Sequence, residues 1–288
     1  MKHLKQLSAL LLFTVFFFAC NKEEALQESI LNPNKKQTLY DIRYGDHYRN
    51  YFDIALPKNR TRETPVVILI HGGAWVMGNK NYFAKDIQTF ADAGIACVTM
   101  NYRYASDISA VHHPDLPMDI RKAIDFICSK ADVWQVSTTR FGIAGHSAGG
   151  HLAMSTAYSF NQDGKIKACV SWAGLTNLID EDQLKITGAD QLFKYYVGCA
   201  LSSPEDTLKY KAASPYWNVT TSSVPTLLVH GTEDPGVPYS NAVRMKAKLD
   251  ELGVENKLVT MQGAYHIWTG EHHEEAREVT LKWFQDHL

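Results

Sequence analysis

Several signals that would mark a nucleic-acid, metal or redox protein are absent from this sequence. The formal net charge is only −2 and no long basic run occurs, so nothing indicates a nucleic-acid partner. The five cysteines include no CxxC pair, which argues against a zinc site or a redox motif. Two histidine pairs, His112 with His113 and His272 with His273, consist of adjacent residues whose side chains point in different directions. We expect both pairs to be surface features and the chain to bind no metal.

Long apolar runs are also scarce, and the longest lies at the N-terminus. Residues 7–19 have the length of a signal-peptide core and are short for a membrane span. The run ends at Cys20 in a pattern that resembles a bacterial lipoprotein signal, although Phe17 departs from the aliphatic residue usual at that position. We expect residues 1–19 to be a signal peptide and residues 20–38 a lipid-anchored linker. The protein is then exported to the periplasm or the cell surface; ordinary secretion is the alternative.

From residue 39 onward the pattern is that of one α/β domain, residues 39–288. Buried parallel strands are predicted at residues 66–70, 95–100, 141–144, 168–172, 226–230 and 257–261, and helices at residues 81–93, 119–130, 150–158, 241–252 and 274–288. Strands that alternate with helices indicate a mostly parallel, doubly wound sheet. Two earlier strands, residues 39–44 and 48–56, are expected to form a hairpin that supplies antiparallel edge strands. Cys97 and Cys169 fall in apolar runs and are expected to be small core residues.

One interval, residues 175–224, is too long for a simple crossover between two neighbouring strands. It contains polar stretches and the aromatic residues Phe193, Tyr195 and Tyr196. Long segments at the carboxyl end of a parallel sheet often form lids or specificity walls. We therefore expect a small helical cap within a single domain.

Residues 145–150 read Gly-His-Ser-Ala-Gly-Gly and directly follow a predicted strand. A G-x-S-x-G motif between a strand and a helix builds a sharp turn that exposes the serine hydroxyl at the end of the sheet. A serine hydroxyl is a poor nucleophile until a base removes its proton, and that base needs an acid to orient it. Ser147 is therefore a candidate nucleophile.

Asp234 and His266 are the candidate partners of Ser147. Hydrolases that place serine on such a turn carry the acid and then the histidine later in the chain. Asp234 follows the fifth buried strand and His266 the sixth, and the carboxyl ends of parallel strands meet at one edge of a sheet. We predict a triad of these three residues. Glu233 is the neighbouring rival for the acid, and two later histidines compete less well because they lie near the final helix.

Backbone donors for a tetrahedral intermediate are predicted after the first buried strand. That strand runs into His-Gly-Gly-Ala-Trp at residues 71–75, where glycine lets backbone N–H groups approach a substrate oxygen. We assign the N–H groups of Gly73, Ala74 and Ala148, the last of which also gains from a helix N-terminus. The alternative is that the glycines serve only a tight turn.

Together these motifs resemble the α/β-hydrolase esterase/lipase group, in the branch with acetyl and feruloyl esterases and kynurenine-formamidase-like enzymes. The resemblance covers about residues 40–288 and rests on residues 71–75, 101–103, 145–153, 212–215 and 225–238. It implies a Ser-His-Asp hydrolase without a cofactor, carried here by Ser147, His266 and Asp234. Ala74 departs from the third glycine of lipase-like relatives, but a backbone donor survives this change. Residues 101–103, Asn-Tyr-Arg, are expected to support the site structurally.

The leading functional hypothesis is a carboxylic-ester hydrolase for small acyl groups, with acetyl or feruloyl esters of carbohydrates as candidates. An amidase, formamidase or peptidase on the same fold is the second, because residues 230–238 also resemble prolyl-peptidase-like domains. A non-catalytic surface lipoprotein is the third. The expected partners are a small-molecule or carbohydrate ester and a membrane, reached through the lipid anchor. The oligomeric state is not predicted.

Overall fold

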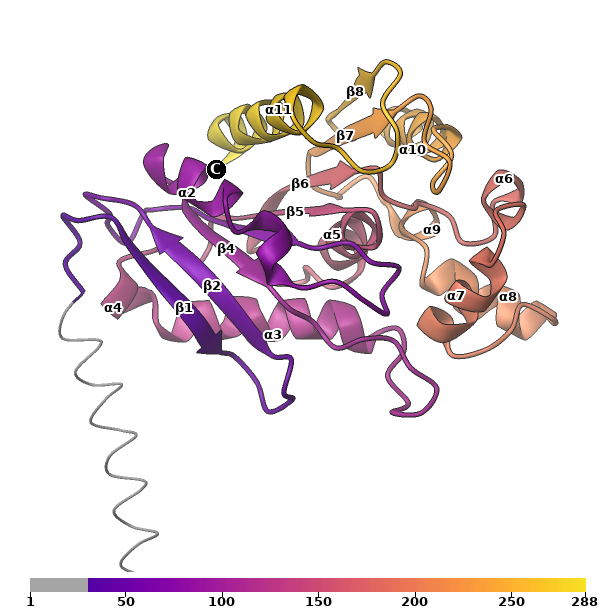
Figure 1. The fold of residues 1–288 in the computed structure, drawn as a ribbon, viewed down its shortest axis with the longest axis horizontal. Helices are drawn as coiled ribbons and strands as arrows, with labels where there is room; N and C mark the ends of the chain where they lie inside the picture. Colours follow the sequence, from indigo (N-terminus) through magenta and orange to yellow (C-terminus); the bar gives the residue numbers. More distant parts are fainter. Residues whose placement is uncertain (1–30) are drawn as a thin grey trace, which may run out of the picture.

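A computed structural model describes residues 31–288, and within them Figure 1 shows a central sheet with helices on both faces. The strands are β1 Gln37–Arg43, β2 Tyr51–Leu56, β3 Val66–Ile70, β4 Ala96–Met100, β5 Phe141–His146, β6 Ile166–Trp172, β7 Thr226–Gly231 and β8 Asn256–Met261. Their order across the sheet is β1-β2-β4-β3-β5-β6-β7-β8. β1 pairs with β2 and β2 with β4 in antiparallel fashion, and all later neighbours are parallel. The predicted, mostly parallel sheet with antiparallel N-terminal edge strands is therefore confirmed.

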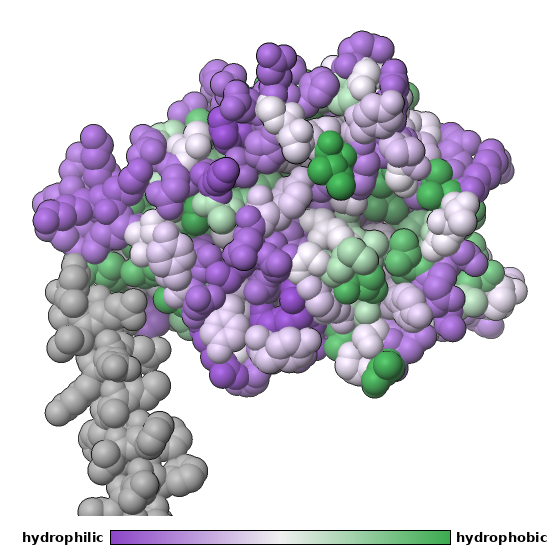
Figure 2. Space-filling view, viewed as in Figure 1, coloured by the Kyte–Doolittle hydropathy of each residue, from purple (hydrophilic) through white to green (hydrophobic). Residues whose placement is uncertain are grey.

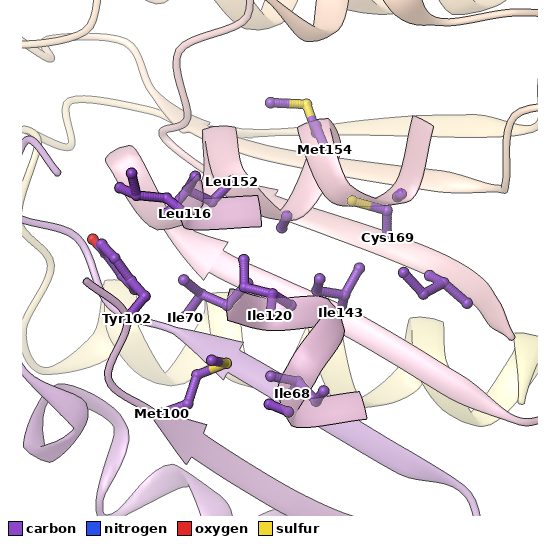
Figure 3. Packing of buried hydrophobic residues seen from close by; sticks show 14 of the residues in the cluster. Ile68, Ile70, Met100, Tyr102, Leu116, Ile120, Ile143, Leu152, Met154 and Cys169 are labelled. Carbon is purple, nitrogen blue, oxygen red and sulfur yellow. The ribbon is translucent and has the colours of Figure 1, made fainter. Parts of the chain in front are cut away.

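Both faces of the sheet are buried at its centre, where every residue of β3 is apolar and buried. In β3, Val66, Ile68 and Ile70 point into one core, and Val67 and Leu69 point into the other. The first core lies against α3 Asp115–Ser129, α4 Ala131–Trp134, α5 Ala148–Ser159 and α10 Ser240–Glu251, and the second against α2 Asp86–Asp92 and α11 Glu271–His287. Figure 3 shows the first core, where side chains of α3 and α5 pack on those of the central strands. Cys97 and Cys169 are buried free thiols in these cores, as predicted.

The helical segment predicted at residues 81–93 is confirmed in part, because the structure divides it into two helices. The segment forms a 3₁₀ helix, η1 Lys80–Phe83, and then α2. In η1, Tyr82 stacks on His146 and Phe83 packs edge-on against Trp172. The partners in these two contacts belong to β5 and β6, which are remote in sequence. Local periodicity therefore does not reveal the break between η1 and α2.

Residues 175–224 hold four short helices within the described part of the chain. They are α6 Glu181–Leu184, α7 Ala189–Val197, α8 Pro204–Ala212 and α9 Pro215–Asn218. Figure 1 places α6, α7 and α8 at the end of the molecule toward which the parallel strands point. Arg244 of α10 pairs with Asp180 and Asp182 at the start of α6, which ties this segment to the body of the fold.

The N-terminal predictions fall mainly outside the described residues. The signal peptide, residues 1–19, and Cys20 precede residue 31, and β1 begins at Gln37 rather than at residue 39. Among the helices of residues 31–288, none has the length and apolar character that a membrane span requires.

Candidate active site

Three loops at the carboxyl edge of the sheet bring the predicted triad together. Ser147 follows β5, Asp234 lies in the loop after β7, and His266 lies in the loop after β8. The hydroxyl of Ser147 is 2.8 Å from His266 Nε2, and His266 Nδ1 is 2.7 Å from Asp234 Oδ2. Asp234, and not its neighbour Glu233, is thus the carboxylate that contacts the histidine.

The backbone at Ser147 is strained in the manner of a sharp strand-to-helix turn. Its φ is 55° and its ψ −122°, a conformation that costs about 1–3 kcal/mol for a residue other than glycine. The flanking positions must be glycine because a larger side chain would collide with neighbouring backbone atoms. A Cβ on Gly145 would lie 2.3 Å from the backbone of Gly149, and one on Gly149 would lie 2.1 Å from the carbonyl oxygen of Ile70. The two glycines therefore let α5 begin directly against β3 and β5, with the serine at the apex.

The carboxylate of Asp234 accepts three hydrogen bonds. Its Oδ1 accepts the N–H groups of Gly236 and Val237, each at 2.8 Å, and its Oδ2 accepts from His266. His230 Nε2 donates to the carbonyl oxygen of Val237 at 2.9 Å and lies 3.4 Å from the same Oδ2. Burial acts to raise the pKa of Asp234, but the contacts with His230 and His266 outweigh it and hold that pKa well below its usual range. An ionised Asp234 keeps the proton of His266 on Nδ1, which leaves Nε2 free to accept the serine proton.

The three predicted backbone donors are unpaired within residues 31–288. The N–H groups of Gly73, Ala74 and Ala148 donate to no group in this part of the chain. Ala74 and the following Trp75 have φ values of 49° and 64°, so this loop adopts the left-handed region without the third glycine of lipase-like sequences. The Trp75 ring stacks on Tyr196 at 4.5 Å, a packing contact that helps hold the conformation.

Sequence reasoning missed two histidines that support the triad. His146 Nε2 donates to the carbonyl oxygen of His266 at 2.7 Å, while the ring of His146 stacks on Tyr82. Burial lowers the pKa of His146 to about 3, and the nearby His266 acts in the same direction, so the ring is a neutral donor. His230 is the second, through its contact with Asp234. His146 occupies the unconstrained position of G-x-S-x-G, and His230 ends a buried strand, so no motif marks either residue.

One residue of the 175–224 segment reaches the turn that holds Asp234. Gln183 in α6 donates from Nε2 to the carbonyl oxygen of Gly236 at 3.2 Å, and its Oε1 accepts from Asn241 at 3.3 Å. The N–H of the same Gly236 binds Asp234. Two successive hydrogen bonds, through Gly236, therefore link helix α6 to Asp234 of the triad.

Residues 101–103 support the site from behind, as predicted. Asn101 Oδ1 accepts the N–H of Lys80 at 2.7 Å, Tyr102 donates to the carbonyl oxygen of His71 at 3.1 Å, and Arg103 pairs with the buried Asp119 at 2.9 Å. These contacts connect the segment after β4 to the loop after β3, to η1 and to α3.

The expectation that both histidine pairs are surface features was wrong for His113. Its ring packs against Phe160 and Tyr196, and its Nε2 is buried. His273 pairs with Asp86 at 2.9 Å. No group of three or more potential metal-ligating side chains gathers anywhere in residues 31–288.

Two cavities meet at Ser147, and both are also lined by Ala74 and His266. The inner pocket, about 200 Å³, is walled by residues of the 175–224 segment together with the loops after β3 and β7: Trp75, Leu175, Ile186, Leu192, Phe193 and Val237. The outer pocket, about 360 Å³, is more open and is lined by Met77, Gly78, Tyr82, His146 and Ile267. Figure 2 shows apolar side chains around a hollow in the right half of one face, whereas the left half is largely hydrophilic. A larger groove of about 620 Å³ lies between β8 and α11 and contains none of the triad residues.

The buried histidines predict a loss of stability in mild acid. Burial lowers the pKa of His71 and His113 to about 4, and of His146 and His151 to about 3. An unfolded chain protonates these rings near pH 6.5, so between about pH 4 and 6.5 it binds more protons and stability rises with pH. The lowered pKa of Asp234 also makes stability rise with pH, but this contribution acts below about pH 4.

We expect the free energy of unfolding to fall by about 1 kcal/mol or more per pH unit below pH 6. Urea unfolding at pH 7.5, 6 and 5 measures this slope. The variant His151→Gln, which removes one of the titrating rings, should have a shallower slope than the wild type. An unfolding free energy that is the same at pH 7.5 and pH 5 would contradict the prediction.

Comparison with known proteins gives one family and several esterase relatives. The sequence profile of the BD-FAE family matches residues 52–249. A probable isoprenylcysteine alpha-carbonyl methylesterase, ICMEL1 of Arabidopsis thaliana, is 27% identical over 78% of this chain and 50% of its own length. The probable carboxylic ester hydrolase LipM of Mycobacterium tuberculosis is 27% identical over 70% of this chain and 49% of its own. The chain thus spans about half the length of these curated relatives.

A solved structure shares the fold along nearly all of its length. This is a truncated form of a carbohydrate esterase from gut microbiota, with a TM-score of 0.73 at 20% identity. The match covers 89% of this chain and 98% of that one.

Proposed function

The chain belongs to the BD-FAE family and has the α/β-hydrolase fold, and from that premise we propose that it is a serine hydrolase of carboxylic esters. The observation that carries the proposal is the continuous hydrogen-bonded path from Asp234 through His266 to the hydroxyl of Ser147. The esterase names of the relatives support the choice of an ester as the bond that is cleaved.

In the proposed reaction, Ser147 Oγ attacks the ester carbonyl carbon while His266 Nε2 takes the hydroxyl proton. The carbonyl oxygen becomes an oxyanion that faces the free N–H groups of Gly73, Ala74 and Ala148. The C–O bond to the alcohol then breaks, and His266 returns the proton to the departing alkoxide. Water attacks the acyl-serine by the same route in reverse, giving the carboxylic acid and free Ser147.

We propose small acyl groups as substrates, with acetyl or feruloyl esters of carbohydrates as the class to test first. The carbohydrate esterase that shares the fold supports this class, and the inner pocket of about 200 Å³ supports the small acyl group. No cofactor takes part in the proposed reaction.

A fluorophosphonate probe tests the proposal, because it labels only a serine that is activated as a nucleophile. We expect one probe per chain, mapped to Ser147 by peptide mass spectrometry, and a parallel loss of hydrolysis of p-nitrophenyl acetate. Turnover of the matching anilide, p-nitroacetanilide, should be far slower. Faster cleavage of the anilide would favour an amidase, and absence of labelling with absence of turnover would favour a non-catalytic protein.

The location of the protein is a separate proposal that rests on the sequence. We propose that residues 1–19 direct export and that Cys20 carries a lipid that attaches the domain to a membrane. Partition into the detergent phase of Triton X-114 by the full chain, and into the aqueous phase by Cys20→Ser, is the expected result. Equal partition of the two would count against the anchor.

A further inference from the structure

We propose that the inner pocket binds the acyl group and the outer pocket binds an apolar alcohol. Two separate sets of side chains then determine the specificity for the acyl part and for the alcohol part of the ester. This inference rests on the ester hydrolysis proposed above. It departs from the carbohydrate esters given there as the first class to test, because Met77, Tyr82 and Ile267 line the outer pocket with apolar surface. It assigns acyl selection to Ile186 and Leu192 of the 175–224 segment, and alcohol selection to Met77 and Ile267.

The order of the chemical steps decides which half enters which pocket. The alcohol leaves first, and water must then reach the acyl carbon from the side that the alcohol vacated, beside His266. The acyl group stays bonded to Ser147 until the second step, so an enclosed site suits it. The outer pocket is the more open of the two, and Met77 and Ile267 in its lining are 60% and 69% exposed.

The inner pocket limits the size of the acyl group. Apolar side chains, Leu192 and Phe193 from α7 and Ile186 from the preceding turn, form the wall facing Ser147. Its volume is about 200 Å³, and an apolar cavity of about 150 Å³ holds a benzene molecule. The polar side chain of Gln183 is already engaged at both ends, by Gly236 and Asn241, so it does not demand a polar acyl group.

The outer pocket has an apolar surface suited to an alkyl or aryl alcohol. Met77 comes from the loop after β3 and Ile267 from the loop after β8, and Tyr82 adds a ring stacked on His146. Neither pocket has an Asp, Glu, Lys or Arg among the described residues that line it. Covering Met77 and Ile267 with an apolar alcohol removes exposed hydrocarbon from water, which favours binding.

A crossed series of alkyl esters tests the assignment, with released acid measured by pH-stat titration. One arm varies the alcohol at constant acetyl, from methyl to propyl to hexyl acetate. The other varies the acid at constant propyl, from acetate to butyrate, hexanoate and decanoate. In the wild type we expect kcat/KM to rise about tenfold along the alcohol series and to fall about tenfold or more from hexanoate to decanoate.

Ile267→Ser and Met77→Ser should each cut the hexyl-to-methyl ratio about threefold and leave the acyl series unchanged. Leu192→Ala and Ile186→Ala should raise the decanoate-to-butyrate ratio about threefold to tenfold and leave the alcohol series unchanged. The two acyl variants lie in different parts of the segment, so one that folds poorly does not spoil the test. Ile108→Ser and Leu208→Ala, exposed residues outside both pockets, are the matched controls and should change neither ratio.

The outcomes separate the two proposals. If the wild type hydrolyses none of the esters, the proposed function itself fails. If it hydrolyses them but Leu192→Ala changes the alcohol series and Ile267→Ser the acyl series, the assignment is reversed and our inference is overturned. It is also overturned if the folded variants change neither ratio, or change both ratios equally.

Discussion

Replacing Ser147 by alanine is expected to lower kcat for ester hydrolysis by about 10⁶-fold, as in other serine hydrolases that lose their nucleophile. Alanine keeps the Cβ that the strained turn already accommodates, so the substitution removes only the oxygen that contacts His266. The thermal unfolding temperature should therefore stay close to that of the wild type. The residual rate above that in water would report the contribution of the free N–H groups and of binding.

Hydrolysis of p-nitrophenyl acetate, with Ser159→Ala of the same helix as a matched control, measures this effect. The control should keep wild-type kcat, because Ser159 ends α5 away from the triad. A Ser147→Ala protein that folds normally and retains more than about a hundredth of wild-type kcat would rule out Ser147 as the nucleophile, given the size of the effect expected.

Replacing Asp234 by asparagine is expected to lower kcat about 10⁴-fold while leaving the fold intact. The N–H groups of Gly236 and Val237 require an oxygen at the Oδ1 position, so the new amide must turn its NH₂ toward His266. That NH₂ donates to Nδ1 and drives the ring proton to Nε2, where the ring can no longer accept the proton of Ser147.

Steady-state kinetics of Asp234→Asn beside Glu233→Gln measure this effect. Glu233 is the adjacent acid but does not contact His266, so its variant should remain within a fewfold of the wild type. The idea would be abandoned if Glu233→Gln lost more activity than Asp234→Asn. Equal, small losses in both variants would likewise argue that neither acid orients the histidine.

The parts of the site that follow from strand ends could be predicted from the sequence. Ser147 and Asp234 follow the buried strands β5 and β7, and His266 follows the edge strand β8. Parallel strands bring their carboxyl ends to one edge of the sheet whatever the detail of their side chains. The 2.7 Å and 2.8 Å contacts of the triad are therefore a consequence of topology as much as of motif.

The features that could not be predicted depend on contacts between residues far apart in the chain. The break between η1 and α2 depends on Tyr82 reaching His146, and the role of His146 depends on the carbonyl of His266, 120 positions later. The division into two pockets depends on how α6 and α7 turn back toward Trp75. The hydrophobic periodicity of a short segment carries no information about contacts with distant segments, so these features could not be predicted from the sequence.

The hydrogen bond from Gln183 to Gly236 has a consequence for exchanging parts between related hydrolases. A foreign insertion grafted between β6 and β7 would bring its own pocket wall, but it would also remove a support of the turn that presents Asp234. Such a chimera would change turnover together with preference unless it kept an amide at the equivalent place. In this chain, therefore, the insertion cannot be exchanged independently of the rest of the site. We expect its sequence and that of the loop after β7 to change together among related proteins.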